Sequence, residues 1–224
     1  IDKIIKISNE EIKNIIKNNN FDKNWSNALS KLNKLGISKK SGGITEVDQE
    51  ILYKLIKGYN RKNILEIGTH IGSSTVVIAL SLNGENDKNF DTVDVNDVND
   101  RREKIWIKFN SKHSPRENLR KLNSLKYTKF IVSDSKKYMN KTKSKYDLIF
   151  LDGNHRTAST YNEIRLSMSL LKQGGIIILH DYINNKNLFG IAGPFLAMKK
   201  LISVNPKLRV KLFKNSSLAL IHKI

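Results

Sequence analysis

Five short hydrophobic runs mark the middle of the chain, and each is bounded by polar or turn-forming residues. The runs are NILEIG (63–68), FDTVDV (90–95), KFIVSD (129–134), YDLIFLD (146–152) and GIIILHD (175–181). Near-continuous runs of this length are typical of strands that are buried on both faces, as in a parallel sheet with helical crossover connections. We therefore expect five parallel strands.

The segments between these runs carry hydrophobic residues at helical spacing. They predict helices over residues 73–82, within the basic stretch 101–124, over residues 135–141 and over residues 157–172. Pro115 is a typical first residue of a helix, so another helix should start there. Such an alternation of strands and helices predicts a parallel sheet with helices packed on its faces.

The N-terminal segment is predicted to be helical. Residues 8–19 begin with a capping box, and residues 22–35 predict a second helix. Thr45 and Asp48 are typical of the start of a third helix, which should end near residue 58.

The last part of the chain predicts a hairpin, from the runs RVKLF (209–213) and LALIHKI (218–224). Together these elements predict a Rossmann-like, doubly wound α/β fold. Its mostly parallel, seven-stranded sheet would carry a C-terminal antiparallel hairpin and N-terminal helices. Because no linker or repeat divides the chain, we expect one domain over residues 1–224. Residues 1–60 would form an N-terminal helical cap, and residues 61–224 a cofactor-binding and catalytic core.

Composition excludes several classes of protein. The chain has 224 residues and no cysteine, which excludes disulfides and thiolate zinc sites. No hydrophobic run reaches the ~18 residues of a membrane span, and the N-terminus has no signal-peptide pattern. We therefore expect a soluble, cytoplasmic protein without a membrane partner. The chain begins with Ile1 and not with methionine, so upstream residues remain open.

The formal charge of +19 raises the question of a nucleic-acid partner. The basic residues are 32 Lys and only 8 Arg, and Lys, Asn and Ile together make up 86 of the 224 residues. A/T-rich codons supply that trio, whereas Arg, which makes bidentate contacts with phosphates and bases, is scarce. We interpret the charge as a solvated surface, and we expect no nucleic-acid groove.

Acidic residues stand at or next to the ends of the five strand-like runs. They are Glu66, Asp94, Asp134, Asp152 and Asp181. Each of them alone is compatible with a turn or cap. However, ligands bind beyond the carboxyl ends of the strands in a doubly wound sheet, so five acids at one rim predict a binding site.

The loop after the first run has its glycines spaced G-x-x-x-G, at Gly68 and Gly72. A nicotinamide-binding loop needs a glycine where His70 stands, and no lysine follows for a Walker-type phosphate cradle. Glu66, two residues before Gly68, would repel a pyrophosphate. The loop therefore favours a cationic ligand.

The segment ILEIGTHIGSST (64–75) resembles the first motif of class I S-adenosylmethionine-dependent methyltransferases. The resemblance implies that the glycine loop packs on the cofactor and that Glu66 helps to hold the amino-acid end of the cofactor, directly or through the loop. It also implies that Asp94 binds the ribose hydroxyls and that Asp134 and Ser135 border the adenine. The cofactor-binding residues that it implies are Glu66, Gly68, Thr69, Gly72, Ser73, Asp94, Asp134, Ser135 and Asp152.

Residues 146–182 are similar to the D-G-x-H and G-G-x-x-x-x-H-D-Y motifs of one methyltransferase branch, which includes the metal-dependent sugar O-methyltransferases of macrolide biosynthesis. This similarity implies O-methylation of a sugar, a glycan or another small hydroxyl compound. Asp152 and Asp181 would supply hard carboxylate ligands for Mg²⁺. His155 would be the catalytic base that takes the hydroxyl proton, with Asp152 beside it.

The metal set departs from the pattern at one position. Tyr182 stands where relatives often carry a second acid, which leaves the set one carboxylate short. Asn154 offers an amide oxygen in compensation, and His180 either approaches the site or packs inward. His155 has an alternative role as a cap of the helix that follows it.

Two other functions share these motifs: an RNA methyltransferase, and an inactive methyltransferase-fold protein that only binds ligands. Acceptor specificity is expected in residues 1–45, the stretch 101–124 and the loop 184–193, which could close over an acceptor. None of these segments carries a readable signature. The sequence leaves the acceptor and the oligomeric state open, and a homo-oligomer is compatible with it.

Overall fold

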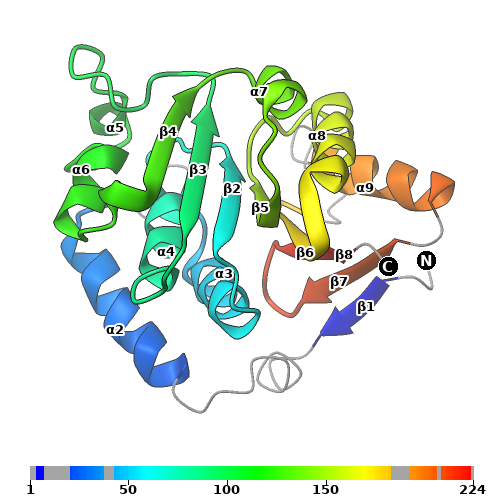
Figure 1. The fold of residues 1–224 in the computed structure, drawn as a ribbon, viewed down its shortest axis with the longest axis horizontal. Coiled ribbons are helices and arrows are strands. Elements are labelled where there is room, and N and C mark those ends of the chain that lie inside the picture. Colours follow the sequence, from blue (N-terminus) through cyan, green and yellow to red (C-terminus); the bar gives the residue numbers. More distant parts are fainter. Residues whose placement is uncertain (1–3, 8–20, 38–42, 183–191, 206–207, 223–224) are drawn as a thin grey trace.

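The computed structural model of the protein describes residues 4–7, 21–37, 43–182, 192–205 and 208–222, whose strands form one sheet (Figure 1). The order of the strands is β1-β7-β8-β6-β5-β2-β3-β4. The strands are β1 (Ile4–Ile7), β2 (Asn63–Ile67), β3 (Asn89–Asp94), β4 (Thr128–Val132), β5 (Tyr146–Leu151), β6 (Leu171–Leu179), β7 (Arg209–Phe213) and β8 (Ala219–His222).

The sheet is mostly parallel, as predicted. Strands β4, β3, β2, β5 and β6 run in the same direction, and β8 is antiparallel to both β6 and β7. The chain extends the sheet from β2 toward β4 and then continues on the other side of β2 with β5. This reversal makes the carboxyl ends of β2 and β5 the topological switch point, where doubly wound sheets bind ligands.

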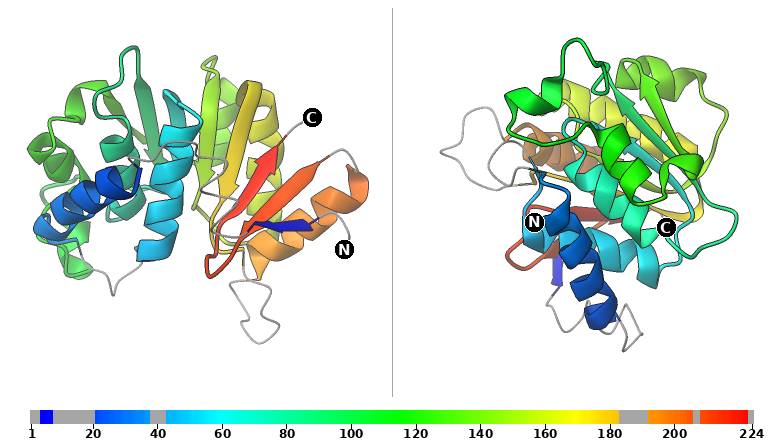
Figure 2. Two further views of the ribbon diagram at one scale, coloured as in Figure 1. Left: turned by 90° about the horizontal axis from the view of Figure 1, so that it is seen from below. Right: turned by 90° about the vertical axis from the view of Figure 1, so that its left-hand side faces the viewer.

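The seven predicted strands are all present, and the structure adds an eighth. Residues Ile4–Ile7 form this strand, β1, which pairs in parallel with β7 at the edge of the sheet. In Figure 2 the blue strand β1 lies beside the C-terminal strands. Four residues carry no clear period, and the partner strand lies at the other end of the chain. The helix predicted over residues 8–19 lies outside the described residues.

The helices divide between the two faces of the sheet (Figures 1 and 2). The hydrophobic core of one face includes residues of α2, α3, α4 and α6, and the core of the other face includes residues of α7, α8 and α9. The helices are α2 (Phe21–Lys34), α3 (Glu46–Gly58), α4 (Ser73–Ser81), α5 (Ile105–Lys108), α6 (Pro115–Lys121), α7 (Ser135–Lys141), α8 (Thr157–Leu170) and α9 (Gly193–Val204), with the 3₁₀ turn η1 (Leu125–Tyr127).

Most helix starts agree with the sequence pattern. The side chain of Thr45 accepts a hydrogen bond from the N–H of Asp48 and so caps α3. The basic stretch 101–124 contains two helices, and the second one, α6, begins at Pro115 as predicted. The first one, α5, has only four residues, and Lys104 and Asn110 on either side of it adopt left-handed backbone conformations. No helix within the described ranges is long and apolar enough to span a membrane.

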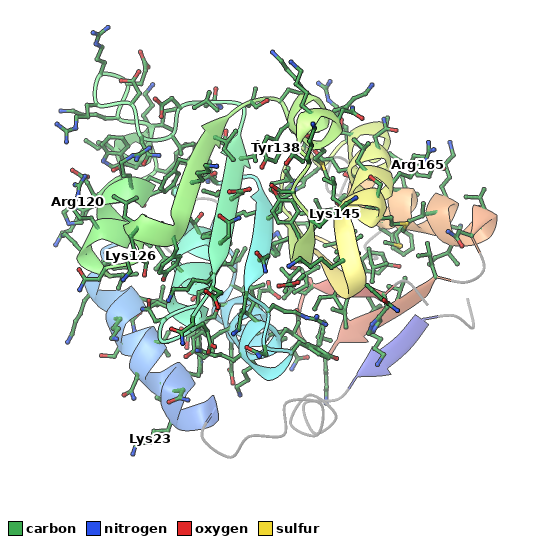
Figure 3. All side chains as sticks on the ribbon, viewed as in Figure 1. Lys23, Arg120, Lys126, Tyr138, Lys145 and Arg165 are labelled. Carbon is green, nitrogen blue, oxygen red and sulfur yellow. The ribbon has the colours of Figure 1, made fainter. Side chains whose placement is uncertain are left out.

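The basic side chains are spread over the molecule. In Figure 3, Lys23, Arg120, Lys126 and Arg165 project from four different elements, and all four are exposed. Exposed charges on separate elements fit a solvated surface.

Candidate active site

A cavity of about 570 Å³ lies at the switch point. Its walls come from the segments that follow β2, β3, β4 and β5, and from one side of α8. This volume is in the range of small-molecule and cofactor pockets. The predicted site residues that line the cavity are Gly68, Asp94, Asp134, Ser135, Asp152 and His155.

Thr69 and Ser73 line a second, smaller hollow, which shares Gly68, His70 and Asp152 with the cavity. Three predicted residues line neither space: Glu66, Gly72 and Asp181. His70 lines both spaces, and its ring packs edge-on against Phe109 with the ring centroids 4.3 Å apart.

Glu66 lies beneath the glycine loop and has no exposed surface. Its carboxylate accepts hydrogen bonds from the hydroxyls of Ser74 (2.5 Å), Thr75 (2.7 Å) and Thr92 (2.6 Å). Burial raises the pKa of Glu66 to about 7, and these hydrogen bonds partly oppose that effect. The interpretation of Glu66 as a lining residue is therefore replaced by an indirect role, because this acid anchors the first turn of α4 below the loop.

Gly68 brings the glycine loop against the turn that follows β5. Its φ is +95°, and a Cβ at this position would lie 2.0 Å from the carbonyl oxygen of Asp152. The loop can approach Asp152 this closely only because residue 68 has no side chain.

Gly68→Ala should therefore destabilise the protein more than Gly84→Ala. Gly84 also has a left-handed φ, of +84°, but a Cβ there would meet nothing within 4 Å. Both variants carry backbone strain, whereas only Gly68→Ala adds an overpacking cost of about 1–3 kcal/mol. Denaturant unfolding of the two variants measures the difference, and equal losses would contradict the close approach.

Asp94 connects the end of β3 to the glycine loop. Its Oδ2 accepts hydrogen bonds from the N–H groups of Thr69 (3.1 Å) and His70 (2.9 Å), and its Oδ1 accepts one from Asn96 (2.9 Å). A carboxylate has about four acceptor positions, so Asp94 keeps capacity for a ligand hydroxyl. Because Asp94 also lines the cavity, it combines a structural and a binding role.

Asp134 and Ser135 begin α7 at the cavity wall. Asp134 caps the helix by accepting a hydrogen bond from the N–H of Lys137, and Ser135 donates its hydroxyl to Glu163 at 2.6 Å. Sequence reasoning missed Glu163. The sequence pattern contained one indication of its role, because Glu163 is an acid on the face of α8 that is otherwise uncharged and buried. That face includes Thr160, Glu163, Ile164 and Ser167.

Two acids and one histidine form a compact cluster beside the cavity. The Nε2 atom of His155 lies 3.4 Å from Oδ1 of Asp152 and 3.5 Å from Oδ2 of Asp181. One ligand atom from each of the three residues fits within 4.8 Å, which is a geometry that could hold a metal ion. The hydrogen bond to Asp152 raises the pKa of His155 above its usual value, although burial opposes this.

His180 approaches the same site from β6, which resolves the alternative that the sequence left open. Its Nδ1 lies 2.9 Å from Oδ1 of Asp152, and its Nε2 lies 3.6 Å from Oδ2 of Asp48. Burial alone would lower the pKa of His180, but hydrogen bonds to Asp152 and Asp48 outweigh it and raise the pKa to about 10. His180 is therefore a cation at neutral pH that lies between the buried carboxylate of Asp48 and the half-buried carboxylate of Asp152.

Asp48 is the second residue of this site that sequence reasoning missed, since it was predicted only as part of a helix start. It has no exposed surface, and it accepts hydrogen bonds from Ser216 and Ser217 in the turn between β7 and β8. Burial would raise the pKa of Asp48, but the hydrogen bonds, first of all from His180, lower it to about 2. A chain of alternating charges thus connects α3 to Asp152.

Asp48→Asn should change the stability of the protein in a pH-dependent way. A pKa that is lower in the folded state, about 2 against 3.8, stabilises the fold above pH ~4, and this contribution disappears as the pH falls toward 2. The difference in unfolding free energy between wild type and variant should therefore shrink by about 2 kcal/mol over that window. Denaturant unfolding between pH 6 and pH 2 checks this, and a difference that is independent of pH would contradict it.

Tyr182 and Asn154 both make contacts within the protein. Tyr182 is buried, its N–H donates to Ser217, and its ring packs against Phe195. The side-chain oxygen of Asn154 accepts a hydrogen bond from the N–H of Arg156. The third residue of the Asp152–Asp181 cluster is His155.

The start of α9 packs against the turn that carries His155. A Cβ on Gly193 would lie 1.6 Å from the carbonyl oxygen of His155. The loop expected to close over an acceptor, 184–193, falls outside the described residues except for its last two positions.

Fold and site together define a doubly wound α/β protein with a cavity beyond the carboxyl ends of β2 and β5. A family model described as a methyltransferase domain matches residues 65–182, which include the glycine loop and the cluster around Asp152. The chain belongs to this methyltransferase-domain family. No curated protein sequence matches the chain.

Solved structures share the fold. Cofactor-bound Rv0187 from MTB is 16% identical, with a TM-score of 0.61 over 89% of each chain. The O-methyltransferase from Bacillus cereus in complex with SAH (S-adenosylhomocysteine) is also 16% identical, with a TM-score of 0.61 over 95% of this chain and 94% of that one. TomG from Streptomyces achromogenes, an O-methyltransferase of tomaymycin synthesis in complex with SAM (S-adenosylmethionine), is 14% identical, with a TM-score of 0.61 over 89% and 88%.

Proposed function

We propose that this protein transfers a methyl group from S-adenosylmethionine to a hydroxyl group of a sugar, a glycan or another small molecule. The observation that carries the proposal is one cavity that brings together the glycine loop, the strand-end acid Asp94 and the Asp152–His155 pair. The family match supports methyl transfer, and structural neighbours that were solved with SAM or SAH support the cofactor. The D-G-x-H and H-D-Y motifs, which resemble those of macrolide sugar O-methyltransferases, support a sugar hydroxyl as acceptor.

The residues that would hold the cofactor lie along the cavity. Gly68 brings the backbone of the glycine loop close to the turn after β5. Asp94 would offer acceptor positions for the ribose hydroxyls, and Ser135 would border the adenine. Asp152 lines the cavity between the loop and His155. When bound, S-adenosylmethionine supplies an electrophilic methyl group on its sulfonium.

At the acceptor end, His155 is positioned to take the proton of a hydroxyl group. An alcohol does not ionise unaided at neutral pH, so methyl transfer to its oxygen needs a base. The Nε2 atom of His155 faces two carboxylates, so in this proposal Nδ1 is the atom that takes the proton. Asp152 accepts from His155 and from His180 on the same oxygen and so orients the base.

The cluster fits a divalent cation. Asp152 and Asp181 offer hard carboxylate oxygens beside the imidazole of His155, all within 4.8 Å. Such oxygens suit Mg²⁺, which completes its shell with water and substrate oxygens. When bound, Mg²⁺ would lower the pKa of the acceptor hydroxyl. In this proposal Asp152 and Asp181 are the ligands, and His155 is the base.

Calorimetric titration with S-adenosylhomocysteine tests the cofactor site. The wild-type protein should bind it at micromolar concentrations. Asp94→Ala should weaken binding about tenfold to a hundredfold, because hydrogen bonds to a charged acceptor contribute ~1.5–3 kcal/mol.

The matched control is Asp97→Ala, an exposed aspartate three residues further on that does not line the cavity. It should bind like wild type. If the wild-type protein does not bind S-adenosylhomocysteine, the proposed function is wrong. If Asp94→Ala binds it with unchanged affinity, Asp94 is not part of the cofactor site.

The acceptor can be found with S-adenosylmethionine that carries a labelled methyl group. The protein is incubated with a panel of sugars, glycans and other small hydroxyl compounds, and mass spectrometry locates the new methyl group. Label on a hydroxyl oxygen supports the proposal. Label on RNA and on none of the small compounds would replace it with an RNA methyltransferase.

A further inference from the structure

A buried acid, Glu163, lines the cavity but has no role in the proposed chemistry. It lies on α8 with only 4% of its surface exposed. Its Oε1 accepts the hydroxyl of Ser135 at 2.6 Å. In the described part of the chain it forms no salt bridge, and Oε2 has no hydrogen-bonding partner.

The glycine of the D-G-N-H turn leaves this carboxylate open to the cavity. A Cβ at Gly153 would lie 3.4 Å from Oε1 and 3.7 Å from Oε2 of Glu163. A side chain at residue 153 would therefore contact the acid. Because residue 153 is a glycine, no side chain fills the space beside this carboxylate, which lines the cavity.

A carboxylate has about four acceptor positions, so Glu163, with one partner and a place on the cavity wall, keeps capacity for a donor from a ligand. Burial raises the pKa of Glu163 to about 6, and the hydrogen bond from Ser135 only partly offsets this. A donor from a ligand would favour the charged form. The acid is therefore suited to a ligand that presents an N–H group at this end of the cavity.

The surroundings of Glu163 combine polar and apolar groups, as the edge and face of a purine require. Ser135, which donates its hydroxyl to the acid, and Val95, an apolar side chain that is 68% exposed, line the same cavity. An amino group on a heterocycle is a donor that carboxylates of Glu and Asp accept. Of the adenine substituents, the 6-amino group is the one with such donors.

We propose that Glu163 binds the 6-amino group of the cofactor's adenine and makes the site selective for an adenosyl over an inosyl cofactor. This rests on the proposed function, because it assumes an adenosyl cofactor in the cavity. In the inosyl analogue a carbonyl oxygen replaces the amino group, so an acceptor of the ligand faces an acceptor of the protein.

The test compares two ligands on two proteins by calorimetry: S-adenosylhomocysteine and S-inosylhomocysteine, with wild type and Glu163→Gln. Wild type should prefer the adenosyl ligand about tenfold to a hundredfold. The amide of Glu163→Gln can donate to the carbonyl oxygen of the inosyl ligand, so the preference should fall to about onefold to threefold. The control Glu103→Gln makes the same chemical change on an exposed side chain outside the cavity and should keep the wild-type preference.

Three results would overturn the inference. If Glu163→Gln weakens the binding of both ligands by the same factor, Glu163 only connects α8 to α7. If wild type binds S-adenosylhomocysteine but prefers it over S-inosylhomocysteine by less than about threefold, Glu163 does not recognise the adenine amino group. This result does not depend on any variant. If wild type binds neither ligand, the proposed function fails, and the inference fails with it.

Discussion

Replacing His155 with alanine should lower the rate of methyl transfer about 10²–10⁴-fold, which is the usual contribution of a positioned general base. The imidazole is oriented by Asp152 and Asp181 at 3.4 Å and 3.5 Å, and no other histidine lines the cavity except His70, which packs against Phe109. The measurement is kcat at saturating cofactor, with the acceptor that the labelled-methyl screen identifies.

The control for this variant is His113→Ala. His113 precedes α6, contacts Lys121 and does not line the cavity, so kcat should stay within about twofold of wild type. The His155→Ala protein should also bind S-adenosylhomocysteine with wild-type affinity, because the base acts on the acceptor. Full activity of His155→Ala would show that the hydroxyl is activated without this base.

Removal of divalent cations should abolish turnover, and added Mg²⁺ should restore it. Asp181→Ala is the sharper variant, because Asp181 belongs to the metal cluster but does not line the cofactor cavity. It should lose metal-dependent activity, by about 10²-fold or more, and bind S-adenosylhomocysteine like wild type. Asp152→Ala combines both effects, since Asp152 also lines the cavity.

A titration with Mg²⁺ separates the two roles open to His155. If His155 is the base, replacing it should lower kcat but leave the affinity for Mg²⁺ within a few-fold of wild type. Weaker Mg²⁺ binding in proportion to the loss of rate would make His155 a third metal ligand. Turnover that resists chelation would mean that the cluster of Asp152, His155 and Asp181 is not a metal site.

The order of strands and helices was predictable because the strands and helices of a parallel sheet protein each have a recognisable local sequence pattern. Its buried strands are continuous hydrophobic runs, and the helices between them keep their own period. Strand β1 escaped prediction because its four residues depend on pairing with β7 from the other end of the chain. Local patterns cannot report such a distant partner.

The candidate site shows the same limit. Gly68 belongs to a short local motif, and Asp94 stands at the end of the next strand-like run, so the sequence identified both as lining residues. The contact of His180 with Asp48 joins residues far apart in the chain, and only the folded structure brings them together. Glu66 was assigned to the cofactor, but the hydroxyls of α4 and β3 bind its carboxylate beneath the loop.

The position of S-adenosylhomocysteine in a crystal structure of its complex with this protein and Mn²⁺ tests the central claim most directly. We expect the ligand in the cavity beyond β2 and β5, with the ribose hydroxyls on Asp94, the adenine amino group at Glu163, and an anomalous peak for the ion between Asp152 and Asp181. A ligand bound elsewhere, or a cavity without ligand at saturating concentration, would contradict the assignment of this cavity as the cofactor site of a methyltransferase.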